Sequence, residues 1–149
     1  MDNPKRILIV DDDENIRLTY AEILKSEGYA VDEAKSGSQA LAKFTKSVYN
    51  LALIDMRLPD MEGTELLKRI KEPNPKTRKI IITGFPTMQN AVESLNKNAD
   101  AYIIKPVDVE NLLRLIEDQL RQQEDERKFS EQKVADFIKT RVKELSSKQ

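Results

Sequence analysis

The chain has 149 residues, a length typical of one domain with room for a short appendage. Its 25 Lys and Arg residues are balanced by 26 Asp and Glu residues, which argues against a general nucleic-acid binder. The absence of cysteine and histidine excludes disulfides, thiolate or imidazole metal sites, Ser-His-Asp and Cys-His catalysis, and a phosphohistidine on this chain. No signal-peptide pattern or long apolar span is present, so we expect a soluble, cytoplasmic protein that binds no membrane.

Short apolar runs alternate with helical patterns along most of the chain. The β-branched run at residues 6–10 predicts a strand buried on both faces, and the weaker run at 30–34 predicts a strand near an edge. Three further strands are expected at residues 51–54, 79–82 and 101–104. Helical spacing after each strand predicts helices around residues 16–24, 36–44, 66–70 and 87–96, and from Asp108 onward.

Local signals mark where several of these helices begin and end. Ser36 with Gln39 forms a capping-box pattern, and Asp108 is placed as an N-cap for the last helix. Gly28 is a stop for the first helix. Strands that each precede a helix predict an α/β fold, a doubly wound parallel sheet with helices on both faces. In such sheets functional groups gather at the carboxyl ends of the strands.

Polar residues follow the predicted strands where a site would form. The first strand leads into Asp11–Asp13, the third ends at Asp55, the fourth at Thr83 and the fifth at Lys105. Carboxylates that converge on one edge repel each other unless a cation lies among them, and an all-oxygen ligand set favours Mg²⁺. A lysine and a hydroxyl beside that ion suit a phosphoryl group, and an Asp carboxylate can serve as its nucleophile.

These motifs resemble the receiver domain of two-component response regulators. The resemblance covers roughly residues 5–120 and rests on DD after the first strand, LIDMRLPDMEG, IIITG and YIIKP, in that order. FPTMQNAVES, ahead of the fourth helix, is most similar to receivers of the nitrogen-regulation type. The resemblance implies a flavodoxin-like sheet with strand order 2-1-3-4-5 and five helices. It also implies a cis Lys105-Pro106 bond.

The resemblance further implies a role for each site residue. Asp55 would accept a phosphoryl group, and Mg²⁺ would be held by Asp12 directly, by Asp11 mainly through water, by Asp55 and by the Arg57 backbone carbonyl. Lys105 would pair with the phosphoryl oxygens.

Thr83 would hydrogen-bond to the phosphoryl group, and Tyr102 would be the switch aromatic on the fifth strand. The donor would be a phosphohistidine on a sensor histidine kinase. Such a domain phosphorylates and dephosphorylates only itself, so we do not expect an enzyme in the ordinary sense.

Phe85 and Arg57 are two further residues near this predicted site. Each lies two residues beyond a site residue, Phe85 after Thr83 and Arg57 after Asp55, and both flank the expected route of an attacking water. A bulky and a cationic side chain there would slow or steer hydrolysis of the phosphoryl group; the sequence does not distinguish the two.

Two other function classes compete with the receiver. A phosphohydrolase of the haloacid-dehalogenase type also uses a strand-end Asp with Mg²⁺, and Asp11 and Asp13 mimic its Asp-x-Asp motif. The Thr or Val expected after that motif is missing, because Asn15-Ile16 follows. A flavin-binding flavodoxin needs a Ser, Thr and Gly-rich phosphate loop, and the acidic run DDDEN is electrostatically unsuited to phosphate without a metal.

The sequence changes character after Pro106. No Gly or Pro occurs from Val107 onward, which predicts that the last helix runs past Leu120 to the C-terminus. We therefore divide the chain into a receiver at 1–120 and a helical extension, coiled coil or linker helix, at 121–149. The polar run 121–128 has no apolar stripe and is expected to be solvated rather than packed on the receiver.

Apolar spacing resumes in the last part of the helix, at Val134, Phe137, Ile138, Val142 and Leu145. This stripe would be exposed on a monomer, which favours a homodimer through the tail, assisted by the face of the fourth and fifth helices. Arg141 on the seam weakens such a coiled coil. Alternatively the chain is a piece of a larger regulator or hybrid kinase, and its kinase, stimulus and output are not encoded in these patterns.

Overall fold

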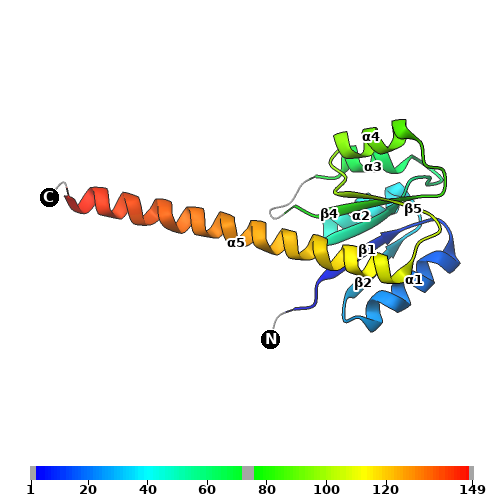
Figure 1. Cartoon of the computed structure of the whole chain (residues 1–149), viewed down its shortest axis with the longest axis horizontal. Coiled ribbons are helices and arrows are strands. Elements are labelled where there is room, and N and C mark those ends of the chain that lie inside the picture. Colours follow the sequence, from blue (N-terminus) through cyan, green and yellow to red (C-terminus); the bar gives the residue numbers. More distant parts are fainter. Residues whose placement is uncertain (1–2, 72–75, 148–149) are drawn as a thin grey trace.

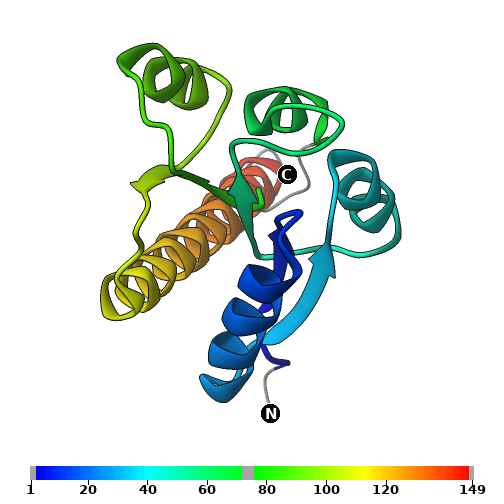
Figure 2. The same ribbon diagram turned by 90° about the vertical axis from the view of Figure 1, so that its right-hand side faces the viewer.

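The computed structural model, which describes residues 3–71 and 76–147, confirms the α/β fold (Figures 1 and 2). Its sheet is parallel, with strand order β2-β1-β3-β4-β5. The strands are β1 Arg6–Val10, β2 Ala30–Ala34, β3 Leu51–Asp55, β4 Arg78–Thr83 and β5 Ala101–Ile104. The predicted position of β2 at an edge is confirmed.

Helices cover both faces of this sheet. They are α1 Glu14–Ser26, α2 Gly37–Lys46, α3 Gly63–Arg69, α4 Met88–Asn96 and α5 Val109–Ser147. One apolar cluster joins α1 and α5 to one face, and a second joins α2 and α3 to the other. Residues 7–10 of β1 are at most 1% exposed, because they alternate between these two clusters. The predicted burial of β1 on both faces is confirmed.

The local signals place the helix ends as the sequence indicates. The Ser36 side chain accepts the backbone N–H of Gln39, and the Gln39 side chain reaches back to the N–H of Lys35. Gly28 follows α1 with φ +93°, a backbone conformation that disfavours side chains with a Cβ. The Asp108 carboxylate accepts the N–H of Glu110 just before α5. Such bonds satisfy backbone donors that a helix leaves free.

Helix α5 is continuous over 39 residues, so it is about 58 Å long at 1.5 Å per residue (Figure 1). The predicted extension past Leu120 is confirmed through Ser147; residues 148–149 lie outside the described part of the chain. From residue 128 to residue 146 every side chain is exposed. Among the described residues no helix is both long and apolar enough to cross a lipid bilayer.

The expectation that residues 121–128 do not pack on the receiver is wrong, although five of these eight residues are exposed. Gln123 is only 3% exposed, and its amide donates to the backbone carbonyls of Asn50 and Lys76 at 2.9 and 2.7 Å. Arg78 at the start of β4 donates to the Glu126 carboxylate at 2.5 Å. Hydrophobic patterning misses this contact, because polar side chains make it by satisfying polar groups at the amino ends of β3 and β4.

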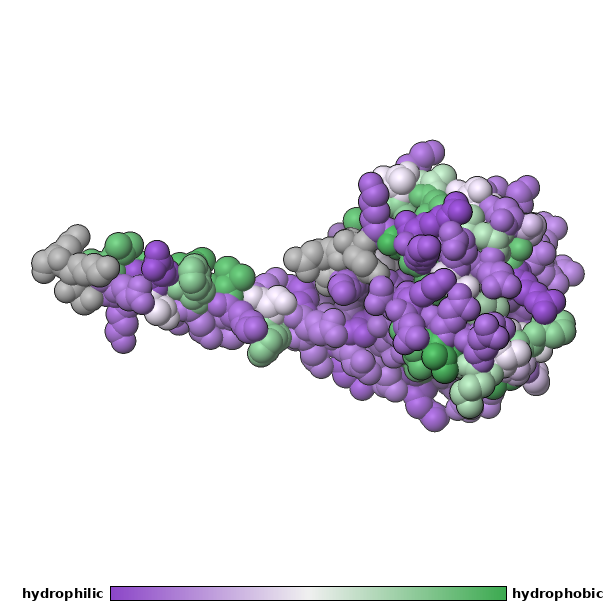
Figure 3. All heavy atoms as spheres, turned by 90° about the horizontal axis from the view of Figure 1, so that it is seen from above, coloured by the Kyte–Doolittle hydropathy of each residue, from purple (hydrophilic) through white to green (hydrophobic). Residues whose placement is uncertain are grey.

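Two apolar helix faces are left uncovered. On α4, Met88, Val92 and Leu95 are 81%, 48% and 57% exposed. On the projecting part of α5, the predicted stripe is more than half exposed throughout, and its side chains gather along one edge of the helix in Figure 3. Large apolar side chains on contiguous exposed faces mark surfaces for a partner.

Candidate functional site

Three carboxylates meet where β1 and β3 end. Val10 pairs with Ile54 in the sheet, so the residues that follow them, Asp11 and Asp55, lie side by side. Asp12 joins them, and one carboxylate oxygen of each of the three lies within 4.8 Å of the others. The structure therefore brings together all three residues that the sequence predicts as side-chain metal ligands.

Burial makes these carboxylates costly to ionise. Asp11 is 5% exposed, and burial raises its pKa to about 6, although the backbone N–H of Asp13, at 2.9 Å from Asp11 Oδ1, opposes the rise. Burial also raises the pKa of Asp55, against the opposing charge of Lys105. A cation among the three oxygens would relieve both costs.

Lys105 supplies a positive charge from the far side of the cluster. Its Nζ lies 3.4 Å from Asp55 Oδ1 and 3.9 Å from Asp11 Oδ2. Its backbone N–H donates to the Thr83 carbonyl at 2.8 Å, which holds the end of β5 against the end of β4. The Lys105-Pro106 bond is cis, so that prediction is confirmed.

Thr83 and Tyr102 occupy neighbouring strands beside this cluster. Ile82 pairs with Asp55, so Thr83 lies one residue beyond it; its hydroxyl is buried and accepts the N–H of Phe85 at 3.0 Å. Tyr102 packs against the apolar cluster of α2 and α3. Within residues 3–71 and 76–147 its buried hydroxyl has no hydrogen-bond partner. A buried hydroxyl without a hydrogen-bond partner costs free energy.

Arg57 and Phe85 lie against each other in the loops that follow β3 and β4. The Arg57 guanidinium carbon is 4.1 Å from the centre of the Phe85 ring, a cation–π contact. Phe85 is 60% exposed. The contact links two loops that each begin at a site residue, Asp55 and Thr83.

The sequence patterns did not indicate two residues, Arg17 and Asp60, whose contacts hold segments next to the site residues. Arg17 on α1 donates to the Asp11 backbone carbonyl at 2.8 Å and forms an ion pair with Glu33. The Asp60 carboxylate accepts the backbone N–H groups of Gly37 and Ser38 and the Ser38 hydroxyl, and these bonds lower its pKa to about 2. The Asp60 bonds join residues 22 and 23 positions apart, and the Arg17 bond depends on how α1 packs beside the end of β1, so no local pattern could have indicated them.

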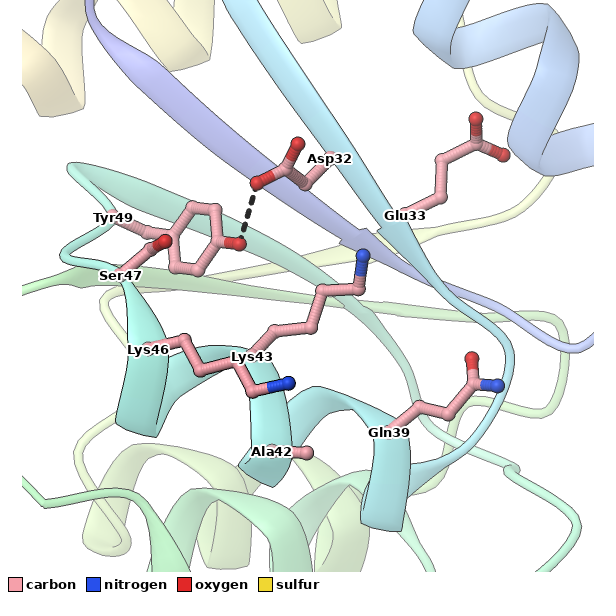
Figure 4. Close-up of a pocket in the computed structure, with 8 residues that line it drawn as sticks. All are labelled: Asp32, Glu33, Gln39, Ala42, Lys43, Lys46, Ser47 and Tyr49. Carbon is pink, nitrogen blue, oxygen red and sulfur yellow. Dashed lines mark hydrogen bonds between the residues drawn. The ribbon is translucent and has the colours of Figure 1, made fainter.

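A groove of about 380 Å³ lies apart from this site, between α2 and the edge strand β2 (Figure 4). Lys43 and Lys46 line one side, and Asp32 and Glu33 line the other. Asp32 accepts the hydroxyl of Tyr49 at 2.6 Å, and burial with this bond raises the pKa of Tyr49 to about 12. The groove shares no residue with the acidic cluster, so the two are separate features.

The donor set fits a hard divalent cation. Asp11, Asp12 and Asp55 offer only carboxylate oxygens, the ligands that Mg²⁺ prefers. The chain has no histidine or cysteine that would favour zinc. Because each carboxylate offers one oxygen to such a cation, the cluster with its adjacent lysine can hold the ion beside a phosphoryl group and leave the other oxygen of Asp55 to react.

Most of the chain matches one family of signalling proteins rather than of classical enzymes. The family model described as response regulator receiver domain matches residues 7–117. The chain is 40% identical over 111 residues to the transcriptional regulatory protein ZraR of Escherichia coli, and that match spans 74% of this chain but a quarter of ZraR.

Solved structures agree with this match. A receiver domain protein described as CheY-like, from Methanospirillum hungatei JF-1, is 48% identical with a TM-score of 0.80, over 83% of this chain and 99% of that one. The beryllofluoride-activated NtrC4 receiver domain dimer is 33% identical with a TM-score of 0.74, over 79% and 98%. The resemblance to receivers of the nitrogen-regulation type is thereby confirmed, and the phosphohydrolase and flavodoxin alternatives are set aside. The chain belongs to the family of response regulator receiver domains of two-component systems.

Proposed function

We propose that Asp55 is the phosphoacceptor of this receiver and that a phosphohistidine on a sensor histidine kinase is the donor. The observation that carries the proposal is the cluster itself: three carboxylates within 4.8 Å, with the Lys105 ammonium 3.4 Å from Asp55. An Asp55 oxygen forms the new P–O bond while the P–N bond of the donor breaks and its imidazole keeps the electron pair.

Asp11, Asp12, Asp55 and the Arg57 backbone carbonyl are the proposed ligands of Mg²⁺, with Asp12 binding directly and Asp11 mainly through water. Bound there, Mg²⁺ supplies charge neutralisation for the transferring phosphoryl group. Lys105 stabilises the phosphoryl oxygens by its ammonium charge. Arg17 and the N–H of Asp13 hold Asp11 in place from its two ends.

Thr83 and Tyr102 are the proposed switch. When Asp55 is phosphorylated, the Thr83 hydroxyl turns to the phosphoryl group and gives up the N–H of Phe85. The loop after β4 then moves, and Tyr102, whose hydroxyl is buried without a partner in the described structure, changes position with it. Support comes from the strand positions of both residues and from the bond between Thr83 and Lys105.

The surface that responds is proposed to be the face formed by α4, β5 and α5, which pairs with a second copy of the chain. Val92 and Leu95 on α4 and Ile104 on β5 are about half exposed there. The NtrC4 receiver, similar in fold, is described as a dimer in its beryllofluoride-activated form. The C-terminal helix is a second proposed surface for self-association. Because the match covers a quarter of ZraR, an output domain on a longer protein is the alternative means of response.

Labelling with acetyl phosphate tests the proposed phosphoacceptor. Asp55→Asn should abolish incorporation while leaving the circular dichroism spectrum unchanged, because the amide fills the same space but is not a nucleophile. Asp13→Asn is the matched control, since Asp13 is an exposed N-cap outside the cluster. Asp55→Asn protein that labels as well as the control would refute the proposal.

Calorimetric titration with Mg²⁺ tests the proposed metal site. Asp12→Ala should weaken binding by roughly tenfold or more, since it removes one of three anionic ligands. Asp13→Ala should bind as the unaltered chain does. Unchanged affinity in Asp12→Ala would remove Asp12 from the ligand set.

A further inference from the structure

The exposed stripe at the end of α5 continues the face by which the start of α5 packs on the sheet. The buried side chains of the first half include Ile116, Gln119, Leu120 and Gln123. Eighteen residues after each of them stand Val134, Phe137, Ile138 and Arg141. Because eighteen residues make five full turns at 3.6 per turn, both sets lie on one side of the continuous helix. The stripe therefore faces the side on which its own receiver lies.

The direction of the projecting segment is fixed where it leaves the receiver. Gln123 is bonded to two backbone carbonyls at the amino ends of β3 and β4, and Glu126 is paired with Arg78. Lys5 ahead of β1 contacts Glu124 at 3.4 Å. These contacts hold α5 from three strands, so the stripe cannot turn outward without breaking them.

A parallel pair of such helices would collide with the receivers. Paired helices lie 8–10 Å apart, with their apolar faces toward each other. In a parallel pair the second helix would continue alongside Ile116 and Leu120, into space that the sheet fills, because both residues are packed on it. In an antiparallel pair the second helix overlaps only the projecting segment, and its receiver lies beyond the far end. We propose that a second copy of this chain binds the projecting stripe in the antiparallel direction, with the two receivers at opposite ends.

The charges beside the stripe favour the same direction. Lys133 and Glu144 stand eleven residues, about three turns, apart, so they lie on the same flank at opposite ends of the stripe. Consider an antiparallel pair in which Val134 of each copy lies opposite Leu145 of the other. Lys133 of each copy then lies about 3 Å along the helix axis from Glu144 of the other copy. Parallel pairing would set Lys133 level with Lys133. Arg141 on the seam is partly neutralised by Glu144 of its own helix, 3.4 Å away.

This surface is separate from the proposed phosphorylation-responsive face. Asn111 and Leu115 lie against the end of β5. They project roughly a third of a turn around α5 from the side that carries Ile116 and the stripe. Tail pairing therefore does not depend on Asp55. Two chains that pair through their tails cannot also pair with each other through the face formed by α4, β5 and α5. This arrangement differs from the single shared interface expected from the sequence.

Sedimentation of the whole chain over a range of concentrations tests whether the tails pair. The chain should show a monomer–dimer equilibrium, and Ile138→Lys should weaken it by roughly tenfold or more, because it places a charge in the seam. Gln132→Lys, on the opposite exposed side of the same helix, is the matched control and should associate as the unaltered chain does. The same result is expected in an Asp55→Asn background. A chain that stays monomeric throughout, or equal behaviour of the two lysine variants, would overturn the proposal.

Cysteine cross-linking tests the direction, and the chain has no native cysteine to interfere. Val134→Cys and Leu145→Cys chains, mixed and mildly oxidised, should form a disulfide between unlike chains, and each alone should form little. Efficient cross-linking of Val134→Cys with itself would show a parallel pair and refute the antiparallel arrangement. Neither readout involves phosphorylation, so failure here is distinguishable from failure of the proposed phosphoacceptor.

Discussion

Asp11 is a buried acid in the proposed cation site. Its burial disfavours the charged form, and the neighbouring charges of Asp55 and Asp12 add to that cost. The Lys105 ammonium, 3.9 Å away, offsets only part of it. Keeping Asp11 charged in the metal-free receiver therefore lowers the stability of the fold, and a cation bound at the proposed site would restore it.

Without metal, the free energy of unfolding should fall as pH rises from about 4 to about 7. The folded pKa of Asp11, about 6, lies above its unfolded value of about 4, so the folded state holds the extra proton between them. The contribution of Asp11 to the free energy of unfolding is fully present below about pH 4 and is lost as the pH rises past about 6. Urea unfolding with chelator should show this slope, and Asp11→Asn should flatten it. A slope that persists in Asp11→Asn would assign the effect to other groups.

The contact between Arg57 and Phe85 should lengthen the life of the phosphorylated state. It joins the two loops that flank the proposed route of an attacking water, and an exposed cation–π contact contributes about 0.5–1 kcal/mol. Phe85→Ala should therefore speed loss of the phosphoryl group by roughly twofold to fivefold, followed as decay of labelled protein. Phe85→Tyr keeps the ring and serves as control. Slower loss in Phe85→Ala would contradict this role.

At the scale of elements, α5 joins the two ends of the sheet. Its first turns follow the strand that ends at Lys105, and its middle is bonded to the amino ends of β3 and β4 through Gln123. Arg78 contacts Asp100, Gln119 and Glu126, so the same helix is also held at β4. The folded receiver thus extends some seven residues past Leu120, the boundary expected from the sequence.

Gln123→Ala should lower the free energy of unfolding by about 1–3 kcal/mol, because it leaves the carbonyls of Asn50 and Lys76 without their donor. Gln132→Ala, on the exposed part of the same helix, should change it by less than about 0.5 kcal/mol. Urea unfolding measures both. Equal stability of the two variants would show that residues beyond Leu120 add nothing to the receiver.

At the scale of the whole molecule, the receiver offers two apolar surfaces that face different ways. The exposed side chains of α4 lie on the receiver itself, whereas the α5 stripe lies on the segment of α5 that projects beyond the sheet (Figure 1). Helix α4 contacts β5, the strand that carries Tyr102. The α4 surface would thus respond to phosphorylation, whereas the α5 stripe would hold two copies together in both the phosphorylated and the unphosphorylated state.

Beryllofluoride should therefore promote an association that depends on α4 and not on the tail. Val92→Glu should reduce it by roughly tenfold, because it places a charge in an apolar contact, while Gln89→Glu nearby should not. Both variants should be measured in chains that also carry Ile138→Lys, because that substitution removes association through the tail. Light scattering with and without beryllofluoride would show the difference. Activation that leaves Val92→Glu and Gln89→Glu equal would exclude the α4 face.

The sequence alone determined the order and type of the elements and the identity of the acidic cluster. Runs such as residues 6–10 are apolar on both faces, and only a central parallel strand buries both. Parallel strands share one carboxyl edge, so residues after successive strands, Asp11, Asp55 and Lys105, had to meet there. The absence of Gly and Pro after Pro106 predicted that α5 continues past Leu120, because helix stops are local signals.

Only the tertiary structure decided how α5 sits and which way its stripe faces. Gln123, Glu126 and Arg78 are unremarkable as polar residues in sequence, and their partners are 47 to 73 positions away. The contacts of Arg17 with Asp11 and of Arg57 with Phe85 depend likewise on how separate segments come together. Patterns of apolar residues report burial along one element, whereas polar partners are chosen by geometry between elements, and that geometry exists only in the folded chain.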